Sequence, residues 1–283
     1  MTAAVFSARF DAATPVFAIL SDGRVHGTLS PGLFGRVMAR VGLKGACVPF
    51  QVDPADLGAA VASLRILHLA GAGVAAPYKE QVVPHLDVLS EGANIIGAVN
   101  TIVRRKSVLK GYNTNAIGVM DALDERGFAV AGRRALVVGT GGAARATVFI
   151  LVWLHAAQVW VAGRNPEAAA RLTAALGGTA VNLHNVAQAA GQADLVINAT
   201  SASSPQEAPE LAALLSGLPL GNCQLLLDLN CGRRENFWRA AAEAAGCPFC
   251  DGLRVLAYQA RRSFFLWTGI EVPPEEFVSA LHA

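Results

Sequence analysis

The sequence predicts an α/β fold whose second half is a Rossmann-type, doubly wound parallel sheet. Three observations support this prediction: a glycine turn that follows an apolar strand, an alternation of strands and helices from about Arg133 to Cys250, and the composition. Hydrophobic residues make up 53% of the 283 residues and charged residues 16%, which is typical of a well-buried globular chain. This length allows two domains.

The glycine turn reads GTGGAA, in which Gly139, Gly141 and Ala144 match the G-x-G-x-x-G/A pattern. Gly139 permits a tight turn, Gly141 lets the backbone approach a pyrophosphate, and Ala144 lets helix and strand pack closely. Gly142 and Ala143 then open a helix whose free N–H groups and dipole favour phosphate. We therefore predict a dinucleotide site at this turn, with a merely structural turn as the alternative.

Cofactor choice depends on the end of the second strand of this sheet. An acid there would bind the ribose 2′-hydroxyl of NAD, whereas Arg164 suits the 2′-phosphate of NADP. NADP is therefore favoured. NAD stays possible because Glu167 follows, although Glu167 also fits the first turn of a helix. The strands of this sheet are expected at 135–138, 158–162, 195–198, 225–228 and 247–250.

The first half predicts a separate compact α/β unit. Ser30-Pro31 has the arrangement of an N-cap followed by the first residue of a helix. Strands are expected at 16–20, 46–52, 64–74 and 97–103, and helices at 32–41, 55–63 and from 76–80 onward. Further helices are expected at 116–126 and 253–268. The second of these carries Leu256, Gln259, Ser263 and Trp267 at helical spacing.

Composition also excludes several classes of partner. The net charge of +2, without a basic stripe, predicts no nucleic-acid partner. No apolar run is long enough to span a bilayer, and the N-terminus lacks a signal-peptide pattern, so we expect no membrane association. Five cysteines suggest no disulfide framework and hence a cytoplasmic protein. No metal site is predicted, although Cys247 and Cys250 leave a zinc or redox site as a minor alternative. The expected partner is a small-molecule substrate, and the expected assembly is a monomer or homodimer.

Seven separated segments together resemble the shikimate/quinate dehydrogenase family. They read LSP from Leu29, PYK from Pro77, GAVNT from Gly97, GYNT from Gly111, GTGGAARA from Gly139, NATS from Asn198 and GLRVLAYQA from Gly252. The resemblance implies a substrate domain of residues 1–114 with 252–283 returning to it, a Rossmann domain of residues 115–251, and a cleft between them.

The resemblance also implies roles for single residues. Lys79 resembles the family's catalytic lysine, Asn100 and Gln259 resemble substrate ligands, and Thr28 with Ser30 resembles the pair that binds a carboxylate. Taken singly, each has a structural alternative, such as a solvated lysine or a plain helix cap. Beyond the glycine turn, the resemblance implies cofactor contacts by Asn198, Thr200 and Gly252.

The sequence departs from the family at several positions that are expected to lie around the substrate. The family's acid that pairs with the lysine is replaced by Asn115, and an asparagine and a threonine are replaced by Gly73 and Ala75. Asn230 holds the place of a family tyrosine, and Val255 that of a methionine. Shikimate has three hydroxyl groups that need partners, so these losses argue against shikimate as the preferred substrate.

The lysine itself keeps a plausible chemistry. Without an acid neighbour, Lys79 should deprotonate more easily and can act as a general base, with Asn115 as a polar substrate contact. We therefore predict an NADP-preferring oxidoreductase that acts on a small alicyclic or polar hydroxy/keto acid. The alternatives are an NAD-linked quinate or shikimate dehydrogenase and a non-catalytic protein that only binds the cofactor.

Overall fold

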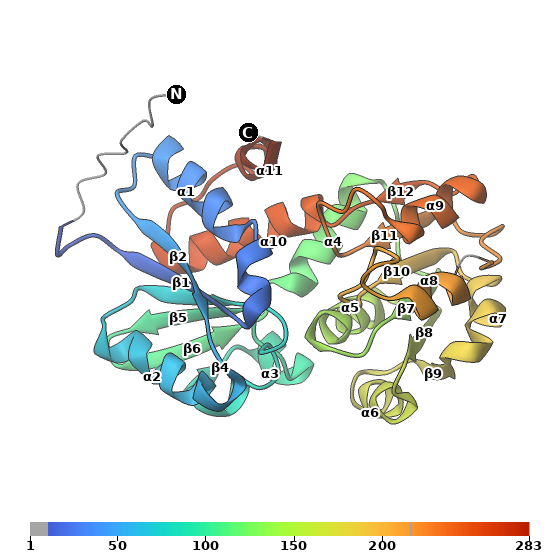
Figure 1. Cartoon of the computed structure of the whole chain (residues 1–283), viewed down its shortest axis with the longest axis horizontal. Helices are drawn as coiled ribbons and strands as arrows, with labels where there is room; N and C mark the ends of the chain where they lie inside the picture. Colours follow the sequence, from blue (N-terminus) through green and yellow to red (C-terminus); the bar gives the residue numbers. More distant parts are fainter. Residues whose placement is uncertain (1–10, 216, 283) are drawn as a thin grey trace.

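The structure is a computed structural model that describes residues 11–215 and 217–282. It contains two six-stranded sheets, at the left and the right of Figure 1. Two helices, α4 (Asn115–Glu125) and α10 (Leu253–Thr268), pack against each other between the sheets. They approach closely at Gly118, where an added Cβ would lie 2.9 Å from the Val255 carbonyl oxygen.

The first sheet is mixed and has the strand order β2-β1-β3-β5-β6-β4. Strand β5 is antiparallel to both of its neighbours, and the other pairs are parallel. Its strands are β1 (Val16–Ser21), β2 (Ala46–Gln51), β3 (Gly71–Val74), β4 (Val88–Leu89), β5 (Thr101–Arg105) and β6 (Val108–Tyr112). The elements around it are η1 (Gly23–Gly27), α1 (Ser30–Arg40), η2 (Pro54–Asp56), α2 (Leu57–Ile66), η3 (Val83–His85), α3 (Glu91–Ile96) and α11 (Pro274–His282).

Side-chain alternation along β1 explains how this sheet is covered. Phe17 and Ile19 point to one face and pack with α1, α10 and α11, while Ala18 and Leu20 point to the other face and pack with α2. Trp267 of α10 stacks on Phe17, with ring centroids 4.8 Å apart. The last helix segments thus complete the core of the first sheet.

The second sheet is entirely parallel, with the order β12-β11-β10-β7-β8-β9. This is the doubly wound order, which reverses between β7 and β10 and leaves a crevice at their carboxyl ends. Its strands are β7 (Arg134–Val138), β8 (Gln158–Gly163), β9 (Thr179–Asn182), β10 (Leu195–Asn198), β11 (Leu225–Asp228) and β12 (Phe249–Cys250). The connecting elements are α5 (Gly142–Trp153), α6 (Pro166–Leu176), η4 (Leu183–Asn185), α7 (Val186–Ala190), α8 (Pro209–Leu215) and α9 (Phe237–Ala244).

The predicted fold class is confirmed, and the helix predicted at 253–268 has the observed bounds. Three local predictions are wrong. The strand expected at 64–74 begins only at Gly71, because Leu64 continues the buried stripe of α2. The helix expected from 76–80 is a series of turns that ends in η3, where Pro84 lacks an N–H group. The strand expected from Gly97 starts at Thr101, since Gly97 instead ends α3 with a positive φ of 68°.

The unpredicted elements include α3, α11, β4, β6 and β9. Strand β9 is an edge strand with mostly exposed residues, so its sequence has no buried alternation to reveal it. Within the described ranges, no helix combines the length and apolar character that a bilayer-spanning helix requires.

Candidate active site

The glycine turn lies where the second sheet changes direction. Gly139 follows β7 with a φ of +131°, and an added Cβ would lie 2.7 Å from the backbone carbonyl of Ala199, just after β10. Gly141 caps α5 without any side-chain hydrogen bond, and its own added Cβ would meet only one atom, 4.0 Å away on Glu80. Gly141, Gly142 and Ala143, at the start of α5, all line a pocket. This is the arrangement that binds a phosphate.

Two pockets adjoin at this edge of the sheet. The larger has a volume of ≈ 1520 Å³ and the smaller ≈ 450 Å³, both counted with the solvent at their open mouths. The larger pocket lies over the glycine turn and the ends of β8, β10 and β11, and is lined by Gly139, Gly141, Gly142, Ala143, Arg164 and Thr200, among others. The smaller pocket lies between the first sheet and α10. Lys79 lines both pockets, so it marks the place where they meet.

Two predicted cofactor residues lie behind the larger pocket and do not line it. Asn198 is fully buried, and its Oδ1 accepts hydrogen bonds from the Thr200 N–H (3.0 Å) and Oγ1 (2.7 Å). Gly252 precedes α10 and packs against the backbone of Leu229. Both support the wall of the pocket and do not face the space inside it.

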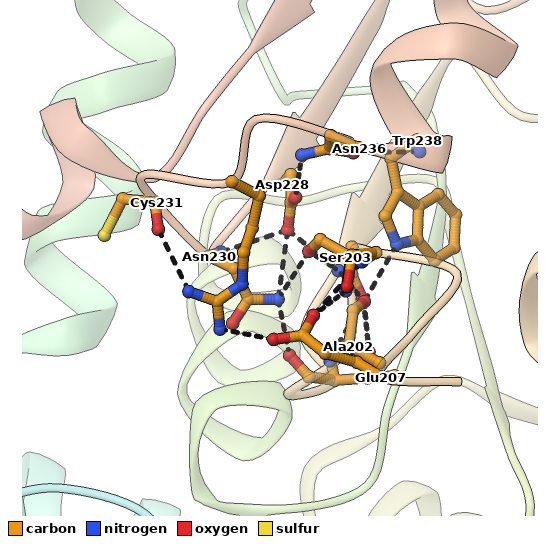
Figure 2. Close-up of polar contacts among 12 residues, drawn as sticks. Ala202, Ser203, Glu207, Asp228, Asn230, Cys231, Asn236 and Trp238 are labelled. Atoms are coloured by element: carbon orange, nitrogen blue, oxygen red, sulfur yellow. Dashed lines mark hydrogen bonds and ion pairs between the residues drawn. The ribbon is translucent and has the colours of Figure 1, made fainter. Parts of the chain in front are cut away.

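Figure 2 shows a buried polar cluster around the carboxylate of Asp228, at the end of β11. This carboxylate accepts hydrogen bonds from Asn198 Nδ2 (2.8 Å), the Asn230 N–H (3.0 Å) and Asn236 Nδ2 (2.7 Å). Burial raises the pKa of Asp228. Asn230 Nδ2 in turn donates to the Thr200 carbonyl oxygen at 3.0 Å. The cluster thus ties the loops after β10 and β11 together along one wall of the larger pocket.

Two arginines line the larger pocket, Arg24 and Arg164, and they differ in whether another side chain already pairs with them. Arg24 is paired with Asp22 at 2.7 Å, whereas Arg164 has neither an ion pair nor a hydrogen bond to any other described residue. Glu167, the acid that kept NAD possible, lies in the first turn of α6 and pairs with Arg171 at 3.5 Å. Glu167 is therefore an acid in the first turn of a helix, which was the alternative to its binding the ribose of NAD.

Lys79 is the predicted proton-transfer residue, and it is half-buried where the two pockets meet. Burial lowers its pKa from 10.5 to about 8. No carboxylate of the described chain pairs with its ammonium. Its backbone is fixed by the Val99 N–H, which donates to the Lys79 carbonyl oxygen at 2.7 Å. An added Cβ on Gly142 would lie 2.8 Å from the Lys79 Cβ, so that glycine allows the two segments to touch.

Three of the predicted substrate residues line the smaller pocket: Ser30, Asn100 and Gln259. Ser30 is the first residue of α1 and not its N-cap, which is Leu29, so the predicted capping role is wrong and the Ser30 hydroxyl forms no cap. Thr28 does not line the pocket, but its Oγ1 accepts a hydrogen bond from the Ser30 N–H at 3.4 Å. Thr28 therefore supports Ser30 from behind.

Asn115 lies next to the smaller pocket, linked to it through Asn100. Asn100 Nδ2 donates to Asn115 Oδ1 at 2.8 Å and to Gln259 Oε1 at 3.4 Å. Gly73 and Ala75, which stand where the family has an asparagine and a threonine, both line the pocket. A side chain at position 73 would collide with Ile19, whose Cδ1 lies 2.7 Å from the added Cβ.

An apolar wall completes the smaller pocket and was not predicted as part of a site. It consists of Ile19, Phe34, Leu256 and Trp267. The spacing of Leu256, Gln259, Ser263 and Trp267 was recognisable in the sequence as one face of a helix, and all four line this pocket. The spacing alone does not show that this face of the helix borders a pocket.

The C-x-x-C pair belongs to the core of the second sheet. Cys247 and Cys250 are buried free thiols, and the Cys247 thiol interacts with that of Cys223. No group of three His, Cys, Asp or Glu side chains in 11–215 and 217–282 is placed to hold a metal ion.

A doubly wound sheet of this order holds a dinucleotide at its switch point, and the adjoining pocket then suits a second reactant. The molecule is therefore of the dinucleotide-dependent dehydrogenase class. Sequence models of three parts of one family match it: the shikimate dehydrogenase substrate binding domain over residues 23–102, shikimate/quinate 5-dehydrogenase over 122–229, and the shikimate 5′-dehydrogenase C-terminal domain over 252–282. The chain belongs to the shikimate dehydrogenase family.

Known proteins agree with this assignment. A protein of Moorella thermoacetica named shikimate dehydrogenase (NADP(+)) is 37% identical over 93% of this chain and 90% of its own length. One of Thermococcus kodakarensis with the same name is 35% identical over 94% of both chains. The crystal structure of shikimate 5-dehydrogenase from Thermus thermophilus in complex with NADP(H) and shikimate is similar, with a TM-score of 0.82 and 32% identity over 95% of this chain and 99% of that one.

Proposed function

We propose that this protein is an NADP-dependent oxidoreductase that transfers hydride between the cofactor and a small alicyclic or polar hydroxy/keto acid. The observation that carries the proposal is the position of Lys79, which borders both pockets. A residue at that junction can exchange a proton with a substrate oxygen while the substrate carbon faces the cofactor. The similarity to proteins named shikimate dehydrogenase (NADP(+)) supports the same reaction class.

The residues of the larger pocket fit NADP. The uncapped start of α5 would hold the pyrophosphate through Gly141 and Gly142, and the free Arg164 would hold the 2′-phosphate. When bound, this cofactor supplies or accepts the hydride. Thr200 lines the same pocket, and Asn198 fixes the Thr200 loop.

Lys79 would hold and move the proton. With a pKa of about 8, it is mostly an ammonium at neutral pH and can donate to a carbonyl oxygen, while about one tenth is neutral and can accept a hydroxyl proton. Asn100 and Gln259 would orient the substrate, and Ser30, supported by Thr28, would contact its carboxylate. Because Gly73, Ala75 and Asn115 leave hydroxyl groups short of partners, we propose that shikimate is not the preferred substrate.

We also propose that residues 1–114 with 252–283 form the substrate domain and residues 115–251 the cofactor domain. The packing of Phe264 and Trp267 with the first sheet supports this division. The five free thiols favour the reducing cytoplasm. A monomer or a homodimer is expected, which light scattering during size-exclusion chromatography would distinguish.

The function is tested by following the absorbance of reduced nicotinamide with shikimate, quinate and a panel of hydroxy and keto acids, each with NADP and with NAD. We expect turnover with NADP, and turnover lowered by about 10²–10⁴ in a Lys79→Ala protein. Turnover only with NAD would favour the NAD-linked alternative. Tight NADP binding in calorimetry without turnover of any panel member would contradict the proposal and favour a non-catalytic cofactor-binding protein.

A further inference from the structure

One arginine connects the two halves of the molecule. Arg145 lies in the first turn of α5, directly after the glycine turn, and its Nε donates a hydrogen bond to the carbonyl oxygen of Ile96, the last residue of α3. Helices α3 and α5 lie next to each other (Figure 1). Arg145 therefore joins the helix start that is proposed to hold the pyrophosphate to a segment beside the first sheet.

The end of α3 is suited to receive a cation. The last carbonyl groups of a helix have no N–H partner within the helix and carry partial negative charge, so a guanidinium interacts favourably with them. Gly97 follows Ile96 in the left-handed conformation, with a φ of 68°. A Cβ at Gly97 would lie 2.9 Å from Arg145 Nη2, so this glycine also makes room for the arginine.

The three residues after Gly97 lead from this contact to the site. Ala98 packs against α5, since a Cβ added to Gly142 would lie 3.4 Å from the Ala98 Cβ. The Val99 N–H donates to the Lys79 carbonyl oxygen at 2.7 Å. The third residue, at position 100, is the asparagine that lines the smaller pocket. These residues thus form one connection between α5, the backbone of Lys79 and the smaller pocket.

Arg145 can affect Lys79 through this connection or through its charge, and the charges favour the connection. The pKa of Lys79 is lowered by burial and not by a neighbouring charge of the described chain. Burial raises the pKa of the adjacent Glu80, and there the Arg145 guanidinium opposes the shift. Removal of Arg145 should therefore loosen the position of Lys79 while Lys79 still titrates near pH 8.

We propose that Arg145 is a positioning residue for Lys79, because it fastens residues 97–100, and through them the Lys79 backbone, to the helix start that holds the cofactor. Proton transfer requires Lys79 to lie at a fixed place relative to a substrate that faces the cofactor. A misplacement of about 1 Å can lower a rate about 10²-fold. This inference rests on the proposed function, since it assigns a residue that supports the proposed proton transfer.

The connection itself is tested without turnover, by hydrogen exchange and mass spectrometry of the protein with and without NADP. In peptides that cover residues 92–103, Arg145→Ala should speed exchange about tenfold, as expected for the loss of a hydrogen bond from a charged group. Arg261→Ala is the matched control, because Arg261 Nε likewise donates to a backbone carbonyl oxygen, that of Val272, at 2.9 Å, and Arg261 lines neither pocket. It should leave the exchange of these peptides unchanged.

Turnover then reports the position of Lys79. On a substrate that the panel identifies, Arg145→Ala should lower kcat about 10- to 100-fold and keep the Kd for NADP within about twofold. The pH transition near 8 should stay in place. Arg145→Lys keeps a cationic donor and should recover part of the loss. It is also the second variant in case Arg145→Ala does not fold.

Exchange at residues 92–103 or a kcat that no folded Arg145 variant changes would overturn the inference. An equal fall of kcat in Arg261→Ala, or a shifted pH transition in Arg145→Ala, would overturn it as well. Faster exchange in Arg145→Ala, with no turnover of any panel member by the unmodified protein, would instead contradict only the proposed function. The two failures are therefore distinguishable.

Discussion

The two pockets that meet at Lys79 differ in how they are built. The larger pocket lies at the carboxyl ends of parallel strands, over a glycine turn in which a Cβ at Gly139 or Gly142 would collide with neighbouring atoms. The smaller pocket is lined by residues of β1, α1, β3, the turns that carry Lys79, the segment before β5 and α10. The backbone of the glycine turn is part of the fold, so the fold and the class of cofactor are fixed together. The side chains of the smaller pocket can be replaced one at a time, so single substitutions can change which ligand it binds. Of the departures from the family, Gly73, Ala75 and Asn115 fall in or beside the smaller pocket, whereas Asn230 lines the larger one.

The largest effect is expected where the pockets meet. Lys79→Ala should lower kcat by about 10²–10⁴ on the substrate found, because the proton-transfer group is lost. Affinity for NADP, measured by calorimetry, should stay nearly unchanged, since Lys79 is not among the residues proposed to hold the cofactor. Lys44→Ala, which removes a lysine that lines neither pocket, is the control. Near-normal turnover of the Lys79 variant would remove this residue from the mechanism.

The second effect concerns the backbone of the larger pocket. Gly139→Ala places a Cβ at a φ of +131° and 2.7 Å from the Ala199 carbonyl, at a strain of about 1–3 kcal/mol. The Kd for NADP should rise about tenfold or more, and Tm should fall. Gly221→Ala, where the added Cβ meets no atom within 4 Å, should change neither. An unchanged Kd would mean that the turn does not shape the pocket.

A third effect sharpens the choice of cofactor. Calorimetry should show tighter binding of NADP than of NAD, and Arg164→Ala should narrow that gap about tenfold, because charge-assisted hydrogen bonds to the 2′-phosphate are lost. Arg171→Ala is the matched control, since Arg171 lies one turn into α6 and pairs with Glu167. Tighter binding of NAD by the unmodified protein would show that another group selects the cofactor.

The smallest effect concerns the side chains of the smaller pocket. Asn115→Asp should raise shikimate oxidation, and Ala75→Thr should add to it, by about 0.5–1.5 kcal/mol for each new hydrogen bond. The two gains should not be additive, since both side chains would touch one ligand, and a double-mutant cycle of kcat/KM measures the coupling. Efficient shikimate oxidation by the unmodified protein, slowed by Asn115→Asp, would contradict the case against shikimate.

The same difference between the pockets explains what the sequence could predict. Gly139 and Gly141 directly indicate a tight backbone turn. The turn, the parallel sheet and the cofactor residues that line the larger pocket could therefore be predicted from the sequence. The orientation of the Asn115 amide could not, because it depends on Thr114 and Asn100 meeting in three dimensions. The turns that carry Lys79 were predicted as a helix, since the local sequence does not reveal how they pack against the start of α5.

The role of Lys79 is tested most directly by the pH dependence of kcat/KM in both directions. Its lowered pKa of about 8 means that the neutral amine needed for oxidation accumulates as the pH rises. Oxidation should therefore increase up to about pH 8 and then level off, while reduction, which needs the ammonium, should decline above about pH 8. Asn115→Asp should move both profiles upward by about 1–3 pH units, because a nearby carboxylate stabilises the ammonium. Profiles without a transition near pH 8, or profiles that Asn115→Asp leaves in place, would contradict proton transfer by Lys79.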